Sequence, residues 1–240
     1  IEDNAQAPGA MIKEKFTGTI GDFGIFSLNR HKAMQCGEGG VVLSNDLELT
    51  QRLRLVRNHG EVLVEAMNVK NISNMIGLNY RMTNMEAAVA IEQLKKLEII
   101  NEPRIELANR LSENLKHIEG IDSPLVRDDC THVYYFYAMR YDEDIVGMPR
   151  KIFCQSVEAE GFTLKSGYVR PIYLEPMYQQ KIGFGNDGFP FSANDRINEI
   201  NYSKNSCPNC ENIQDHKLIW TNIIYPPLEN SDMDQFCYAI

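Results

Sequence analysis

Short apolar runs bounded by small or polar residues recur in the first fifty residues, and they predict buried strands. Residues 1–3 and 22–27 end such runs, and Val41-Val42-Leu43-Ser44 forms another. Runs of this length with Gly, Asn or Asp at their ends are typical of strands inside a sheet. Helical patterns follow them along the chain, so the sequence predicts an α/β sheet.

A helix is predicted from Leu47 to Arg57, because three apolar residues in this stretch fall on one helical face. These residues are Leu49, Leu53 and Val56. Residues 61–76 show no clear period and contain few Gly or Pro residues. We expect an extended surface excursion in that stretch.

A long helix is predicted to begin near Thr83. Thr83 and Glu86 have the spacing of a capping box, in which a hydroxyl is followed three residues later by a carboxylate. A helical apolar stripe then continues to about Asn101. The stripe consists of Val89, Leu94 and Leu97.

Pro103 is expected to break or restart this helix, because proline lacks the amide hydrogen that a helix interior uses. A second helical stretch follows from Ile105 to His117 and ends at Gly120. This helical pair is the natural link between two domains. We therefore predict a large domain over residues 1–104 and a smaller C-terminal α/β domain over residues 105–240.

The second half predicts a further set of strands and helices. Val133 to Met139 is an aromatic run that predicts a strand, and Pro149 can open a helix that Gly161 closes. Two more strands are predicted, at Val169–Leu174 and Leu218–Ile224.

Composition narrows the class of protein. Hydrophobic residues make up 43% of the 240 residues and charged residues 24%, as in ordinary globular proteins. The net charge of −9 argues against nucleic-acid binding, which needs a basic surface. No apolar run approaches the roughly 20 residues that span a membrane, and no signal peptide is visible. We expect a cytoplasmic protein that binds neither nucleic acid nor membrane.

Lys32 is the residue that says most about function. It follows Ser27 by five residues and precedes the turn Gly37-Glu38-Gly39-Gly40. A serine hydroxyl can hold a phosphate, and a lysine amine can form a Schiff base with an aldehyde. Upstream, Asp3 follows an apolar residue that could end a strand, and a carboxylate there can keep a pyridine nitrogen protonated. Together these residues resemble the core of an enzyme that uses pyridoxal 5'-phosphate.

Five motifs in a fixed order carry a family resemblance. They are Glu2-Asp3-Asn4-Ala5-Gln6-Ala7, Gly21-Asp22-Phe23-Gly24-Ile25-Phe26-Ser27, Lys32 with Gly37-Glu38-Gly39-Gly40, Arg57-Asn58-His59-Gly60, and Gly77-Leu78-Asn79-Tyr80-Arg81-Met82. This set resembles the DegT/DnrJ/EryC1/StrS family of pyridoxal-phosphate-dependent sugar aminotransferases. The resemblance covers residues 1 to about 115 strongly. It implies the aspartate-aminotransferase-like fold type I, and it implies that the chain holds the C-terminal part of the cofactor domain.

The resemblance implies a role for individual residues. Lys32 would bind the cofactor covalently and later move a proton, and Asp3 would pair with the pyridine nitrogen. Gln6 would lie beside the ring and its phenolic oxygen, and Ser27 would contact the phosphate. Asn79 would reach the cofactor phosphate of a neighbouring subunit, which implies a homodimer with shared active sites. Each residue also has a plain structural interpretation, as a loop lysine, a turn or cap residue, a surface amide or a strand-end serine.

The implied reaction moves an amino group from an amino acid, glutamate by resemblance, to a keto sugar carried on a nucleotide. One alternative is a pyridoxal-phosphate-dependent sugar dehydratase, because a subgroup of the family has His in place of the Schiff-base Lys. His31 stands next to Lys32, but the spacing from Ser27 favours Lys32. A second alternative is a non-catalytic relative that acts as a binding module.

Both ends of the chain predict that the sequence is a fragment. Ile1 stands in the end of a strand, and Ile240 stands inside a helix that Ser231 is expected to cap. We expect the 240 residues alone to lack part of the cofactor domain. They should then bind cofactor weakly or not at all, and their activity alone is in doubt.

A few residues stay open. His59 suits either a turn or the wall of a site, and Arg81 suits either a surface charge or a partner for an anion. Cys207 and Cys210 have the spacing of a metal or redox pair, but no second pair lies nearby in the sequence. We expect reduced structural thiols at these positions and no metal site.

Overall fold

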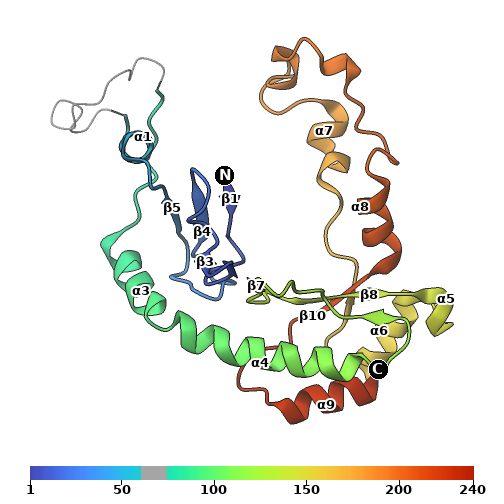
Figure 1. Ribbon diagram of the computed structural model, residues 1–240. Coiled ribbons are helices and arrows are strands. Elements are labelled where there is room, and N and C mark those ends of the chain that lie inside the picture. The colour runs from blue at the N-terminus through green and yellow to red at the C-terminus, as the bar shows by residue number, and fades with distance from the viewer. Residues whose placement is uncertain (61–74) are drawn as a thin grey trace. The chain divides into compact units, whose positions relative to one another are not determined.

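The computed structural model describes residues 1–60 and 75–240, which divide into two compact units (Figure 1). The N-terminal unit comprises Ile1–Ala108 and Leu125–Tyr135, and the C-terminal unit comprises Asn109–Pro124 and Phe136–Ile240. Most of the surface excursion predicted over residues 61–76 lies outside the described residues. The domain boundary at residue 104 stays a prediction.

The N-terminal unit contains the three strands that the apolar runs predict. They are β1 (Glu2–Asp3), β4 (Gly24–Ser27) and β5 (Gly40–Leu43), in the order β1-β4-β5. β1 runs parallel to β4, with Asp3 opposite Ile25, whereas β5 runs antiparallel to β4. Gly24 is required by packing, since a Cβ there would lie 1.9 Å from the carbonyl oxygen of Gly18.

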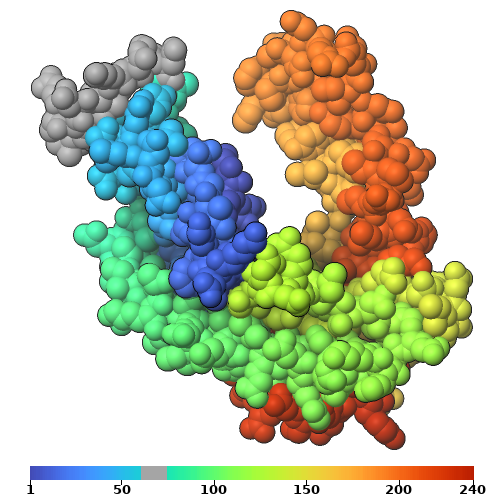
Figure 2. All heavy atoms as spheres, viewed as in Figure 1, coloured from blue at the N-terminus to red at the C-terminus, as the bar shows by residue number. Residues whose placement is uncertain are grey.

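A second small sheet joins distant parts of the N-terminal unit. β2 (Met11–Ile12) pairs with β3 (Lys15–Phe16) on one side and with β7 (Cys130–Thr131) on the other. Figure 2 shows the lime-green residues around β7 against the blue residues near the N-terminus. The segment 125–135 is therefore fixed to the unit that carries the sequence motifs.

The first two predicted helices are confirmed. α1 (Leu47–Arg57) has the predicted bounds, but its buried residue is Leu55, and the predicted face is only half-buried. α3 (Asn84–Leu94) begins after Thr83, and the capping box between Thr83 and Glu86 is complete.

The predicted break at Pro103 is wrong. α4 (Leu97–Leu115) contains Pro103, and the interruption lies earlier, at Lys95 and Lys96. Proline in a helix interior costs about 3 kcal/mol. Contacts on both sides of it offset this cost, because Asn101 donates a hydrogen bond to the carbonyl of Pro8 at 2.9 Å and Leu107 is buried.

The C-terminal unit contains an antiparallel sheet in the order β6-β8-β10-β9. Its strands are β6 (Ile121–Asp122), β8 (Tyr137–Tyr141), β9 (Lys165–Ser166) and β10 (Leu218–Thr221). In β8, Tyr137, Met139 and Tyr141 are buried while Arg140 is exposed, which is the period of two expected for a strand with one buried face.

Helices complete the core of the C-terminal unit. Phe153 of α6 (Arg150–Ala159) packs against Tyr141 in a tilted arrangement, with ring centroids 4.9 Å apart, and Phe162 packs edge-on against Phe236 of α9 (Asn230–Ala239). The helices of this unit, apart from the last turns of α4, are α5 (Glu143–Val146), α6 (Arg150–Ala159), α7 (Pro176–Gln180), α8 (Pro208–Asn212), a π-helix (Ile213–Lys217) and α9 (Asn230–Ala239), with short 3-10 turns at Ile172–Leu174, Phe191–Ala193 and Ile197–Glu199.

Three predictions in this half need correction. The strand predicted from Val133 begins only at Tyr137, because Tyr134 has a positive φ of 47° that no strand accommodates. The strand predicted at Val169–Leu174 is replaced by a 3-10 turn at Ile172–Leu174, which Pro171 precedes. Glu229, not Ser231, caps α9.

Pro149 and Gly161 flank α6 as predicted, and β10 covers the first half of the strand predicted at Leu218–Ile224. Across the two described ranges, no helix combines the length and the apolar character that crossing a membrane requires.

Candidate active site at the edge of the β1–β4 sheet

Glu2 and Asp3 have different environments, although they are neighbours in β1. The carboxylate of Glu2 accepts hydrogen bonds from the amides of Gly18, Ile20 and Gly21 at 2.9, 2.8 and 2.6 Å. These bonds, chiefly those from Gly21 and Gly18, lower the pKa of Glu2. Glu2 thus orders the loop before β4, while Asp3 is exposed and its Oδ1 accepts a local hydrogen bond from the amide of Ala5 at 3.0 Å.

The parallel pairing of β1 and β4 places the predicted residues at one edge of the sheet. Asp3 ends β1 and Ser27 ends β4, so both lie where parallel strands present their carboxyl ends. Ligands bind at this edge in open α/β sheets. Gln6 is exposed in the turn that follows β1, at the same edge.

Lys32 lies in the connection between β4 and β5, which is tightly cross-linked. The amide of Leu28 donates to Gly39 at 2.9 Å, and the amide of Arg30 donates to Gly37 at 2.8 Å. Asn29 also donates to the carboxylate of Glu38 at 2.7 Å. The connection is therefore an ordered turn, and the side chain of Lys32 is half-buried within it.

Tyr135 is a neighbour of Lys32, and it belongs to the aromatic run for which the sequence predicts a strand. The Lys32 Nζ atom lies 4.8 Å from the centroid of the Tyr135 ring, a cation–π geometry. The backbone turn that presents this ring is strained at Tyr134, and His132 Nδ1 accepts the amide of Tyr134 at 2.8 Å. The motif around Lys32 lies about a hundred residues away in sequence, so it gave no signal for this contact.

The motifs on either side of the undescribed segment are brought together. Asn58 and Asn79 form an isolated β-bridge, and the amide of His59 donates to Leu78 at 3.0 Å. A Cβ at Gly77 would lie 1.9 Å from the carbonyl carbon of His59, so this close approach needs glycine.

Within this pairing, the side chains of Asn79 and Arg81 are hydrogen-bonded to each other. Arg81 Nε donates to Asn79 Oδ1, and Arg81 Nη1 donates to Asn58 Oδ1, each at 3.1 Å. Asn79 is exposed and does not cap α3, since Thr83 does. His59 has a positive φ of 65°, which makes it a turn residue.

The second motif group also touches the turn that carries Lys32. The methyl group of Met82 lies 3.0 Å from the position that a Cβ of Gly39 would take, so a side chain there would collide with it. Burial, then the charges of Glu86 and Glu38, raise the pKa of the Cys36 thiol in this turn. Asp3, Gln6, Ser27 and Lys32 therefore share one edge, and the Asn79 segment adjoins their turn.

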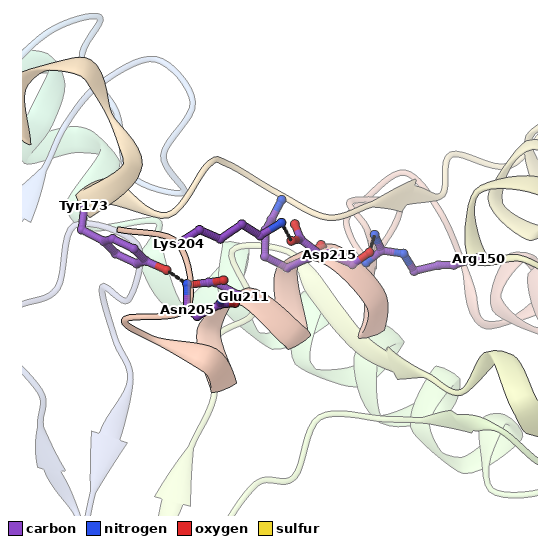
Figure 3. A network of polar contacts seen from close by, with 7 residues as sticks. Arg150, Tyr173, Lys204, Asn205, Glu211 and Asp215 are labelled. Carbon is purple, nitrogen blue, oxygen red and sulfur yellow. Dashed lines mark hydrogen bonds and ion pairs between the residues drawn. The ribbon is translucent and has the colours of Figure 1, made fainter. Parts of the chain in front are cut away.

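The C-terminal unit has a polar cluster of its own (Figure 3). Glu211 is buried and accepts hydrogen bonds from the hydroxyl of Tyr173 and from the amide of Asn205 at 2.7 Å. Further along, Arg150 donates to the carbonyl of Asp215 at 2.6 Å, and Lys204 pairs with its carboxylate at 3.7 Å. No residue of this cluster was predicted from the sequence.

Comparison with known sequences identifies the family to which this chain is similar. The sequence model of the DegT/DnrJ/EryC1/StrS aminotransferase family matches residues 1–219. Among curated relatives, the L-glutamine:2-deoxy-scyllo-inosose aminotransferase of Micromonospora echinospora is 34% identical over 75% of this chain and 44% of its own. The GDP-perosamine synthase of Caulobacter vibrioides is 29% identical over 74% of this chain and 47% of its own.

Comparison with solved structures supports the same fold. The structure of S. venezuelae DesV in complex with a ketimine intermediate has a TM-score of 0.75 and 26% identity, over 98% of this chain and 55% of that one. The predicted α/β fold of the aspartate-aminotransferase type is thereby confirmed. The chain spans about half the length of the curated relatives it matches.

Proposed function

Because the chain belongs to the DegT/DnrJ/EryC1/StrS aminotransferase family, we propose that the complete protein is a pyridoxal-phosphate-dependent sugar aminotransferase. The observation that carries this proposal is the position of Lys32. It lies in an ordered turn that continues directly from Ser27, at the edge of the sheet where Asp3 ends the parallel neighbour strand. The amine of Lys32, the hydroxyl of Ser27 and the carboxylate of Asp3 thus belong to the same edge of the sheet.

This set of groups fits pyridoxal phosphate. The cofactor presents an aldehyde, a phosphate and a pyridine nitrogen, and these suit an amine, a hydroxyl donor and a carboxylate respectively. When bound, the cofactor supplies an electron-withdrawing ring for chemistry at the carbon that bears the amino group. Asp3 would hold the proton on the ring nitrogen, Ser27 would bind the phosphate, and Gln6 would lie beside the ring.

Lys32 would serve twice. Its amine would hold the cofactor covalently and, once released, would take a proton from one carbon and return it to another. Such proton transfer requires an amine held at a fixed place above the reacting atoms. The ordered turn and the ring of Tyr135 beside Nζ support this role, since both restrict where the amine can go.

We infer that the substrate is a keto sugar carried on a nucleotide. The similarity to GDP-perosamine synthase supports this class, whereas the relative from Micromonospora echinospora is named for 2-deoxy-scyllo-inosose. The amino donor is glutamate or glutamine, the second being named in that relative. A nucleotide-linked substrate would place the reaction in the cytoplasm.

The active unit is proposed to be a homodimer. α3 contains no buried residue, and Met85 and Val89 on it are 79% and 49% exposed. An apolar face of this kind, directly after the Asn79 segment, suits contact with a second copy. Asn79 would then reach the cofactor phosphate of the neighbouring subunit.

An assay of products tests the proposal. The complete protein, loaded with pyridoxal phosphate, would be given a nucleotide-linked 4-keto sugar with glutamate or glutamine. We expect the keto group to become an amino group while the donor becomes its 2-oxo acid. A deoxy sugar formed without consumption of the donor would instead indicate a dehydratase. If GDP-, UDP- and dTDP-linked sugars and free inosose all give neither the amino sugar nor the deoxy sugar, the result contradicts the proposed aminotransferase.

A further inference from the structure

Cys207 and Cys210 form a thiol pair on one short turn of the C-terminal unit. Cys207 directly precedes α8, and Cys210 lies within it. Both side chains are exposed, and both cysteines are free. Cys207 has non-helical backbone angles, φ −131° and ψ 69°, and leads directly into the helical turn that holds Cys210.

Pro208 and a backbone hydrogen bond restrain the turn between the two cysteines. Pro208 is the first residue of α8, where its ring fixes φ and its missing amide hydrogen is not needed. The amide of Glu211 donates to the carbonyl of Cys207 at 3.0 Å, which closes the turn around both cysteines. Disulfides require closely spaced Cα atoms, about 4.4–6.8 Å apart, and the two cysteines are three positions apart within this closed turn.

The surroundings of the pair hold this turn in place. Glu211, the residue after Cys210, is buried and bound by Tyr173 and Asn205 (Figure 3). Loss of water contact, the bond to Glu211 and the charges of Glu211 and of both cysteines raise the pKa of Tyr173.

No third metal-ligating side chain joins the pair among the described residues. Within residues 1–60 and 75–240, no group of three or more His, Cys, Asp or Glu side chains is placed to hold a metal ion. A structural zinc site takes four ligands. Two exposed free thiols on one turn can exchange with disulfides.

We propose that Cys207 and Cys210 form a reversible intramolecular disulfide by exchange with a small disulfide such as oxidised glutathione. One protein thiolate attacks a sulfur of glutathione disulfide, whose S–S bond breaks and releases one glutathione thiolate. The second protein thiolate then attacks the mixed disulfide on the protein sulfur and releases the second glutathione. The two protein thiols lose two protons and two electrons, and one glutathione disulfide becomes two glutathione thiols.

The disulfide would act on the turn that Glu211 anchors. Its closure would fix the start of α8, and with it the position of the carboxylate that binds Tyr173 and Asn205. The segment from Tyr173 to Glu211 would therefore respond to the thiol–disulfide balance. This inference does not depend on the aminotransferase proposal, because it concerns residues of the C-terminal unit alone.

Mass spectrometry tests the inference on the complete native protein. The protein would be equilibrated with mixtures of reduced and oxidised glutathione, quenched with acid, alkylated and digested. We expect the peptide with Cys207 and Cys210 to lose two hydrogen atoms and to take up no alkylating reagent. Excess reduced glutathione should restore both thiols. Cys207→Ser and Cys210→Ser should each abolish the disulfide and instead accumulate a mixed disulfide on the remaining thiol.

Cys130→Ser is the matched control, since Cys130 lies in the N-terminal unit and should leave the pair unaffected. Two separate mixed disulfides on the unmutated pair would overturn the proposal. So would pairing of either cysteine with a different thiol, or failure of both to react.

Discussion

The two units of this protein differ in the number of large side chains that are fully buried in each. Among the described residues, the large side chains that are fully buried in the N-terminal unit are Leu28 and Leu55. The C-terminal unit has a continuous core of such side chains. They are Leu111, Leu115, Tyr137, Tyr141, Val157, Leu164, Ile219, Ile224, Met233 and Phe236.

The difference separates two kinds of sequence signal. In the N-terminal unit the sequence signal lies in glycines and polar residues that build the turn around Lys32, and apolar residues such as Met85 stay exposed. In the C-terminal unit the signal lies in alternating burial, as in β8, and its polar cluster carries no recognisable motif. Substitutions in the first unit should therefore change chemistry or association, and those in the second should change stability.

The largest effect is expected from Lys32→Ala in the complete protein. Removal of the amine that moves the proton should lower kcat by about 10⁴-fold or more, because general acid–base catalysis alone contributes about 10²–10⁴-fold and covalent attachment is lost as well. The amino-transfer assay measures it. Lys15→Ala, an exposed lysine on β3, is the control and should retain activity. Substantial activity in the Lys32 variant would remove this residue from the mechanism.

The next effect is on stability. Phe236→Ala should lower the free energy of unfolding by about 3–5 kcal/mol, because it empties a fully buried site beside Phe162. Urea denaturation measures the change. Tyr238→Ala on the same helix is the control, since Tyr238 is 94% exposed. Equal losses in the two variants would contradict the packing described for α9.

Asp3→Asn should preserve the fold and lower kcat by about 10²–10³-fold, because an amide does not hold the proton on a ring nitrogen as a carboxylate does. The comparison is with Asp22→Asn, an exposed aspartate in the loop before β4. Circular dichroism would check the fold of both variants. Full activity in the Asp3 variant would end its assignment as the ring partner.

Val89→Asp should weaken the proposed dimer by at least about tenfold, because it buries a charge in an apolar contact. Sedimentation of the complete protein over a concentration series measures this. Asn84→Asp puts the same charge on the first residue of the same helix and should leave the association unchanged. A monomer in the unmutated protein would contradict the shared active site.

The smallest effect concerns Asp234 on α9. Hydrogen bonds from Arg110, at 2.7 and 2.8 Å, and from Asn114 lower the pKa of Asp234 to about 2. A pKa lowered by folding adds stability above the unfolded pKa near 4, and that stability is lost as the pH falls from about 4 to about 2.

Asp234→Asn should therefore reduce stability slightly at pH 7, and the difference from the unmutated protein should shrink between pH 4 and pH 2. Denaturation at several pH values measures it, with the exposed Asp187→Asn as control. A difference that is independent of pH would show that the charge of Asp234 is not involved.

Local signals gave the parts of the fold that depend on near neighbours. The capping box at Thr83, the bounds of α1 and the strand that ends at Ser27 follow from residues only a few positions apart. The helix through Pro103 did not, because the contact between Asn101 and Pro8 spans most of the N-terminal unit.

The candidate site shows the same limit. Asp3, Ser27 and Lys32 could be named from motifs, because their chemistry is written in residue type and spacing. The contact of the Tyr135 ring with Lys32 and the hydrogen bond from Arg81 to Asn79 could not be predicted from motifs, because they depend on how distant segments pair. The catalytic roles of Asp3, Gln6, Ser27, Lys32 and Asn79 stay predictions.

Covalent capture of the cofactor tests the central claim most directly. The complete protein would be mixed with pyridoxal phosphate, reduced with borohydride and digested, and the modified peptide would be identified by mass. The account predicts one stoichiometric pyridoxyl label on Lys32, absent from the Lys32→Ala variant. A label spread over exposed lysines, or none on Lys32, would contradict it and favour a non-catalytic binding module.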